Sequence, residues 1–176
     1  TIQKFYRITG ESTQRKGIVS DIQMKDFFTY AEVGERYDDY ALAWDKIPGT
    51  NFQKLNYFNI QALEKASADR MAKNSNYQLL LESAQWREKL DKEENITLNI
   101  NKFNELMKQR KAQIEKFKAL SKFENGLKFM MYPSEVEREK KDEAFKKKSE
   151  MWIKNLKKDP YLQEAMNIVS DMGAKS

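Results

Sequence analysis

Two pairs of neighbouring carboxylates are the first residues in this sequence whose type and spacing suggest chemistry. They lie at Asp38 and Asp39 and at Glu93 and Glu94. General acid–base catalysis needs two carboxyl groups in one desolvated pocket, so that their pKa values separate. Neighbours on an exposed loop do not provide such a pocket. We therefore expect no catalytic role for either pair.

Lysine runs near the end of the chain are the second candidate, because they could hold phosphate or an acidic lipid surface. They comprise Lys146, Lys147, Lys148, Lys154, Lys157 and Lys158. Consecutive residues of a helix point in different directions, so a triplet does not form a patch. The net charge of +5 and a pI near 9.1 are compatible with an anionic partner. Acidic residues are interspersed among the basic ones, however, and this favours a solvated, lysine-covered helical surface over nucleic-acid binding.

The absence of histidine and cysteine excludes several classes of site. It removes Ser-His and Cys-His nucleophiles, Cys/His zinc sites, haem and iron–sulfur ligation, and disulfides. No apolar run approaches the roughly 20 residues of a membrane span. We predict no catalytic, cofactor-binding or metal-binding residue in this chain, and no cofactor.

The elements that would position any site divide the chain into three unlike parts. Residues 1–25 are rich in β-branched and aromatic residues and predict a short β segment, the edge of a sheet whose remainder lies elsewhere. Residues 26–58 predict an irregular aromatic connector. Residues 59–176 predict a helical domain, in keeping with 6 glycines and 3 prolines in 176 residues. The fold class is therefore mainly α with a β segment at the front.

Helix starts are marked by capping residues. Asn59 predicts a helix that runs to about Lys73, Asn76 the start of the next, and Asn101 a long helix to about Glu124. After Tyr132, the spacing of Ser134 and Glu137 is typical of a capping box. It predicts one strongly charged helix with a buried face of Phe145, Trp152 and Leu156.

The last helix carries the clearest pattern. Asp159 stands at the cap position, Pro160 at the first helical position and Gly173 at the end. Between them one apolar stripe repeats at helical spacing, and we expect it to face the core. The stripe consists of Leu162, Ala165, Met166, Val169 and Met172.

Residues 1–22 resemble a segment of the bacterial tail-specific proteases, also called carboxy-terminal processing proteases. The quoted residues are Thr-Ile-Gln-Lys-Phe-Tyr-Arg-Ile-Thr-Gly-Glu-Ser-Thr-Gln-Arg-Lys-Gly-Ile-Val-Ser-Asp-Ile, with Ser20 where the family usually has proline. Residues 41–47, Ala-Leu-Ala-Trp-Asp-Lys-Ile, are similar to a family segment that has proline at Ala43. The run from Asp159 to Leu162, followed by Asn167 and Ile168, resembles the close of the long, C-terminally extended subgroup.

The resemblance implies an envelope serine protease with a Ser/Lys dyad and an inserted PDZ domain. In that family the serine and lysine lie just before the segment that matches Thr1, so this chain would lack both and be inactive alone. Ser12 would be structural. The implied partners are the protease and PDZ domains of the same chain, substrates with apolar C-termini and an envelope adaptor, with no nucleic acid. The implied location is the periplasm or cell envelope of a Gram-negative bacterium. The start at Thr1 rather than methionine favours a processed chain or a piece of a longer one.

The helical part would scaffold the protease and PDZ core and offer docking surface for a substrate or adaptor. We expect Trp86, Phe117, Phe145 and Trp152 to be core or groove residues. The connector residues Phe27, Phe28, Tyr30 and Trp44 would dock the helical domain on the protease core. Two alternatives remain open at this point. They are a free-standing helical adaptor and a basic nucleic-acid-binding module, whose binding would depend strongly on salt.

Overall fold

The computed structural model describes residues 3–53 and 57–173, and within these ranges the chain is mainly helical, as predicted. The described helices are η1 (Glu35–Tyr37), α1 (Ile60–Lys73), α2 (Ser75–Asp91), α3 (Ile100–Phe117), η2 (Lys118–Lys122), α4 (Pro133–Glu139), α5 (Glu143–Lys157) and α6 (Leu162–Gly173), where η marks a 3-10 helix.

Asparagine caps start the first three α-helices, although two of them are not the predicted ones. The side chain of Asn59 accepts a hydrogen bond from Ala62 N–H at 3.1 Å, as expected. The prediction of Asn76 and Asn101 was wrong by two residues, because Asn74 caps α2 and Asn99 caps α3. In both places two asparagines stand two positions apart, and the earlier one supplies the cap.

The single charged helix predicted after Tyr132 is interrupted. It divides into α4 and α5, because the backbone of Asp142 is extended rather than helical. The carboxylate of Asp142 caps α5 by accepting a hydrogen bond from Phe145 N–H at 2.9 Å. The predicted capping box is also shifted, since the carboxylate of Glu135 accepts from the backbone N–H of Tyr132 at 3.2 Å. The long helix before it ends at Phe117 and continues as the short η2.

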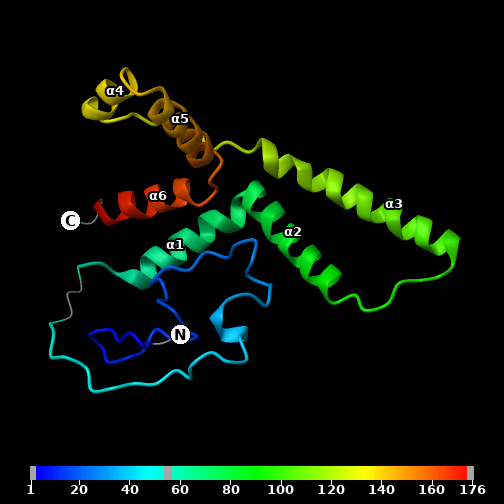
Figure 1. Ribbon diagram of the computed structural model, residues 1–176, viewed down its shortest axis with the longest axis horizontal. Coiled ribbons are helices and arrows are strands. Elements are labelled where there is room, and N and C mark those ends of the chain that lie inside the picture. The colour runs from blue at the N-terminus through cyan, green and yellow to red at the C-terminus, as the bar shows by residue number, and fades with distance from the viewer. Residues whose placement is uncertain (1–2, 54–56, 174–176) are drawn as a thin grey trace.

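The helices form an open arrangement (Figure 1). Helix α1 lies beside α6 and leads into α2, and α4 packs on α5. Helix α3 touches α2 and η2 and projects from the rest, and none of its residues is buried. Between α2 and α3, residues 93–99 form neither helix nor strand.

The core is small for the length of the chain. The buried apolar residues in the described ranges are Leu63, Met71, Tyr77 and Ala84. The accessible surface is 14322 Å², whereas a compact monomer of this mass exposes about 8,900 Å². The chain therefore leaves far more of its surface uncovered than an independent globular domain does.

The predicted β segment is only a rudiment. The described residues contain no strand, and pairing is limited to two isolated bridges, Tyr6 with Ser12 and Glu11 with Lys46. Residues 5–13 form a narrow turn, which we call the hairpin, and residues 18–22 form no strand. Extended backbone needs neighbouring strands to complete its hydrogen bonds, and within the described ranges the 45–50 segment is the neighbour that supplies them.

Candidate docking surfaces

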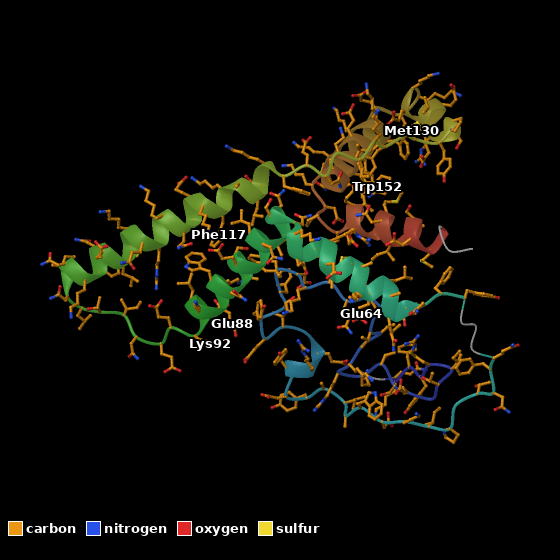
Figure 2. All side chains as sticks on the ribbon, turned by 180° about the vertical axis from the view of Figure 1, so that it is seen from behind. Glu64, Glu88, Lys92, Phe117, Met130 and Trp152 are labelled. Atoms are coloured by element: carbon orange, nitrogen blue, oxygen red, sulfur yellow. The ribbon has the colours of Figure 1, made fainter. Side chains whose placement is uncertain are left out.

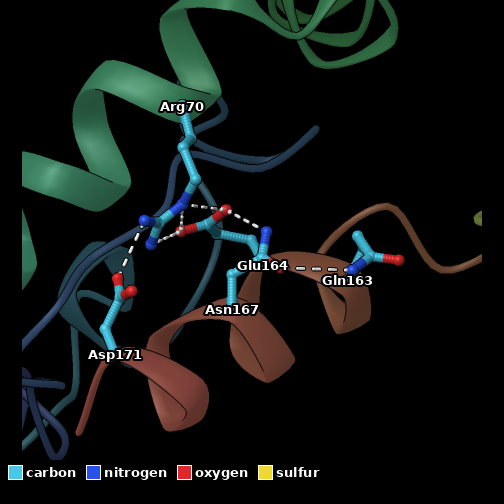
Figure 3. Close-up of polar contacts among 5 residues, drawn as sticks. All are labelled: Arg70, Gln163, Glu164, Asn167 and Asp171. Atoms are coloured by element: carbon cyan, nitrogen blue, oxygen red, sulfur yellow. Dashed lines mark hydrogen bonds and ion pairs between the residues drawn. The ribbon is translucent and has the colours of Figure 1, made fainter. Parts of the chain in front are cut away.

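An ionic cluster joins α1 to α6 (Figure 3). The guanidinium of Arg70 on α1 donates to both carboxylate oxygens of Glu164 on α6, at 2.7–3.1 Å, and to Asp171, about two turns further along the same face of α6, at 2.8 Å. Asn167 donates to Glu164 at 3.1 Å. Glu164 is only 3% exposed, so its charge is held almost entirely by these donors.

The environment of Glu164 fixes its ionised state. Burial alone would raise the pKa of this carboxyl, but hydrogen bonds from Arg70, Asn167 and Ser67 outweigh burial and lower it. The same cluster raises the pKa of Arg70, chiefly through its hydrogen bonds to Glu164. The sequence does not predict this cluster, because Arg70 and Glu164 are 94 residues apart and no local pattern links them.

The ionic face of α6 displaces its apolar stripe from the core. Glu164, Asn167 and Asp171 face α1 instead. The expectation that the stripe faces inward was wrong for Ala165, Met166 and Val169, which are exposed, whereas Leu162 and Met172 are half-buried. Met166 is 53% exposed and Val169 is 61% exposed. The C-terminal helix therefore presents an apolar surface outward.

A first groove lies in the angle between α2 and α3. At its inner end the rings of Trp86 and Phe117 lie 5.6 Å apart and are tilted by 52°. Figure 2 shows Phe117 between the two helices, with Glu88 and Lys92 at the far end of α2. Trp86 lines the groove, as the prediction of a groove residue requires.

A second groove lies against α5 and is small, about 130 Å³. Phe145 and Trp152 line it together with Met131, which confirms these two aromatic residues as groove residues. Trp152 is 62% exposed, so its prediction as part of a buried face was wrong. The guanidinium of Arg138 lies 4.1 Å from the ring centre of Phe145.

The aromatic connector contacts the helices and still leaves much of its surface open. The guanidinium of Arg87 on α2 lies 5.2 Å from the ring of Phe27 and 5.9 Å from the ring of Phe28. Gln85 donates to the hydroxyl of Tyr30 at 3.3 Å. Both phenylalanines are exposed, so part of each ring remains available to a partner.

Hydrogen bonds and an ion pair join the hairpin to the connector. Ser12 is buried, donates its N–H to the carbonyl of Asp45 at 3.0 Å and accepts the N–H of Asp45 on its hydroxyl at 3.1 Å. This pairing gives Ser12 a structural role. The carboxylate of Asp45 also accepts the hydroxyl of Tyr6 at 3.0 Å and pairs with Lys4 at 3.1 Å, while Trp44 stacks under Lys16.

The residues with candidate chemistry lie at the surface and apart from one another. Asp38 and Asp39 are exposed, and Asp38 accepts the N–H of Tyr40 at 3.0 Å. Glu93 pairs with Arg110. The candidate lysines of α5 and its C-terminal end are all exposed. In the described ranges no cluster of acidic residues could hold a metal ion.

None of the helices in the described part of the chain combines the length and the apolar content that crossing a bilayer requires.

Comparison with known proteins places the chain. Residues 28–174 match the family profile described as the C-terminal domain of tail specific protease. A curated relative, the tail-specific protease of Haemophilus influenzae (strain ATCC 51907 / DSM 11121 / KW20 / Rd), is 36% identical over 121 residues, which is 66% of this chain. The chain spans 16% of the length of that relative. It belongs to the family formed by the C-terminal domains of tail-specific proteases.

Proposed function

We propose that this chain is the non-catalytic C-terminal part of an envelope serine protease that trims or degrades proteins from their C-termini. The helical part scaffolds the protease and PDZ domains of the same polypeptide. The observation that carries this role is the accessible surface of 14322 Å², about one and a half times that of a compact monomer of this mass. Such an excess of accessible surface is expected of a segment that wraps around another domain.

The catalytic residues belong to the rest of the parent. A Ser/Lys dyad, in which a desolvated lysine is the base, needs no histidine and fits a chain that contains none. No described lysine is buried, so none has the desolvated setting that the base of such a dyad needs. The chain alone is therefore inactive.

Exposed apolar side chains before α1 form the contact surface for the parent. In the hairpin and connector, the large apolar side chains that are more than one-third exposed are Phe5, Tyr6, Ile8, Ile18, Val19, Phe27, Phe28, Val33, Tyr37, Tyr40, Leu42, Trp44, Ile47 and Phe52. An apolar surface of this extent marks a binding interface. The protease core covers it in the complete protein.

The grooves and the outward face of α6 offer further surface for a substrate with an apolar C-terminus or an envelope adaptor. Helical bundles suit this role, because neighbouring helices leave apolar grooves between charged outer faces. The periplasm or cell envelope of a Gram-negative bacterium is the proposed location. Nucleic acid is not among the proposed partners.

A split-protein experiment tests the scaffold role. The rest of the parent and this 176-residue chain are produced as separate polypeptides, alone and together, and assayed for association and for degradation of a protein substrate. We expect the two pieces to copurify and to regain proteolysis, while this chain alone cleaves nothing. Peptide cleavage by the chain alone, or failure of the two folded pieces to associate, would contradict the proposal.

A further inference from the structure

The groove between α2 and α3 has the dimensions of a ligand site. Its volume is about 500 Å³, within the roughly 300–1,000 Å³ typical of ligand pockets. It is open along one side and is lined by Trp86, Lys89, Leu90, Lys92, Glu93, Leu106, Gln109, Arg110 and Gln113. Both helices contribute, so a ligand in the groove would contact α2 and α3 together.

The floor of the groove is apolar and only partly covered. Trp86 and Leu90 from α2 and Leu106 from α3 are each half-buried. Helix α3 has no buried residue, so its apolar side chains have not found full cover within the described chain. An apolar side chain laid between these three residues would bury surface on both partners.

Positive charge predominates among the lining residues. Three cations, Lys89, Lys92 and Arg110, stand against one carboxylate, Glu93. Lys92 is paired with Glu88 at 2.7 Å, and Arg110 uses one terminal nitrogen for Glu93. Lys89 has no ion pair among the described residues, so an anionic group is the complementary occupant.

Arg110 retains an unused donor in this groove. Its Nε is buried and has no hydrogen-bond partner among the described residues. A buried N–H without a partner is costly, and a guanidinium binds a carboxylate best through two donors at once. A ligand in the groove cannot reach the buried Nε, but Glu93 engages only one of the two terminal nitrogens of Arg110, which leaves the other terminal nitrogen for a carboxylate.

We propose that this groove binds a peptide segment of a partner protein in which a carboxylate side chain stands beside an apolar one. The apolar side chain packs on Trp86, Leu90 and Leu106, and the carboxylate pairs with Arg110 and Lys89. The site does not depend on peptidase activity of the parent, so failure here and failure of the proposed function are distinguishable.

Photo-crosslinking in the full-length protein tests the site. The probe is a five-residue peptide of alternating leucine and glutamate, amidated at its C-terminus and carrying one benzophenone group. A matched probe has glutamine in place of glutamate. Mass spectrometry reports the fraction of peptide joined to residues 82–116. We expect crosslinking of the glutamate probe there, and about a tenfold loss for the glutamine probe, because the charge-assisted hydrogen bonds are removed.

Two variants and a control locate the charge. Arg110→Gln removes the guanidinium, and Lys89→Glu reverses an exposed charge at the rim without touching the floor. Each is expected to reduce crosslinking of the glutamate probe about tenfold or more. Lys111→Ala, an exposed neighbour on α3 outside the lining, should leave it unchanged.

Circular dichroism confirms that each variant keeps its helices before it is compared. Equal labelling by the glutamate and glutamine probes would overturn the proposal. So would labelling outside residues 82–116, or equal losses in Lys89→Glu and Lys111→Ala.

Discussion

The α1–α6 contact and the region that precedes α1 are held together in opposite ways. Between the helices, Arg70 joins a carboxylate that is 3% exposed, and side chains carry the contact. In the hairpin and connector, backbone hydrogen bonds carry the contact, while large apolar side chains such as Phe5 and Tyr40 face outward. The first contact is complete within this chain. In the second, the backbone hydrogen bonds are made but the apolar side chains stay exposed, which is the pattern of a segment that lies against another surface.

The largest expected effect on stability comes from breaking the α1–α6 contact. Arg70→Ala leaves the buried charge of Glu164 without its main partner and should lower the free energy of unfolding by about 2–3 kcal/mol. The upper end of the usual range is not reached, because the Arg70 side chain is 33% exposed and water screens part of the loss. Urea unfolding followed by circular dichroism measures the change.

Two further variants sharpen this result. Lys65→Ala, on the exposed side of α1, should change stability by less than about 0.5 kcal/mol. Arg70→Met combined with Glu164→Leu should recover most of the loss, since both charges leave together. If the single Arg70 variant were as stable as the Lys65 control, α1 and α6 would not depend on the cluster.

The contact between the hairpin and the connector can be disrupted by a substitution that leaves the helices unchanged. At Gly10, where φ is 81°, an added Cβ would lie 1.9 Å from the carbonyl oxygen of Ile47. Gly10→Ala should therefore separate the hairpin from the connector and make residues 3–50 much more sensitive to limited proteolysis, with helical unfolding unchanged.

Gly17 supplies the matched control for this experiment. Its φ is 64°, yet an added Cβ would meet nothing within 4 Å, so Gly17→Ala costs only the left-handed conformation, about 1 kcal/mol. Equal proteolysis of the two variants would show that the close approach of Gly10 to Ile47 does not hold the region together.

A smaller effect is expected from acid. The pKa of Glu164 is lowered in the folded chain, so its contribution to stability is full above about pH 4.5 and is lost as pH falls through the folded pKa. The stability difference between the native chain and Glu164→Gln should therefore shrink between pH 6 and pH 3 in thermal unfolding. Glu143→Gln, at an exposed position, is the control, and a constant difference would contradict the account.

The smallest effect concerns alkaline pH. Burial raises the pKa of Tyr161 to about 12, and its ring packs edge-to-face on Tyr77 at 6.4 Å. A raised pKa gives a contribution that is full below about pH 10, the usual tyrosine value, and is lost as pH rises toward 12. The pKa values of Tyr6 and Tyr77 are raised as well, so absorbance at 295 nm should show a group of late-forming tyrosinates that loses one member in Tyr161→Phe. Formation of that tyrosinate near pH 10 would show the ring to be open to water.

The sequence predicted those features that depend on neighbouring residues. The mainly α class and the cap at Asn59 were confirmed, because propensity and capping act within one turn. The caps at Asn74 and Asn99 were missed by two residues, since nothing local distinguishes two asparagines so close together. The break before α5 was missed because Asp142 could serve equally as a cap or as a helix-surface ion pair.

Features that depend on distant residues could not be read in this way. The apolar stripe of α6 predicted an inward face at Met166 and Val169, yet Arg70 draws Glu164 inward from 94 residues away. The domain boundaries at residues 25 and 58 stay predictions. The groove beside Trp86 was foreseen only as an aromatic position, since its charges come from two helices that the sequence does not place together.

Hydrogen exchange measured by mass spectrometry tests the central claim most directly. Amides of residues 3–53 are compared in this chain alone and in the full-length parent, with α1 and α6 as internal references. If the region is built to lie against the rest of the parent, its amides exchange rapidly in the isolated chain and become protected in the parent, while α1 and α6 change little. Equal exchange of residues 3–53 in both proteins would contradict the account.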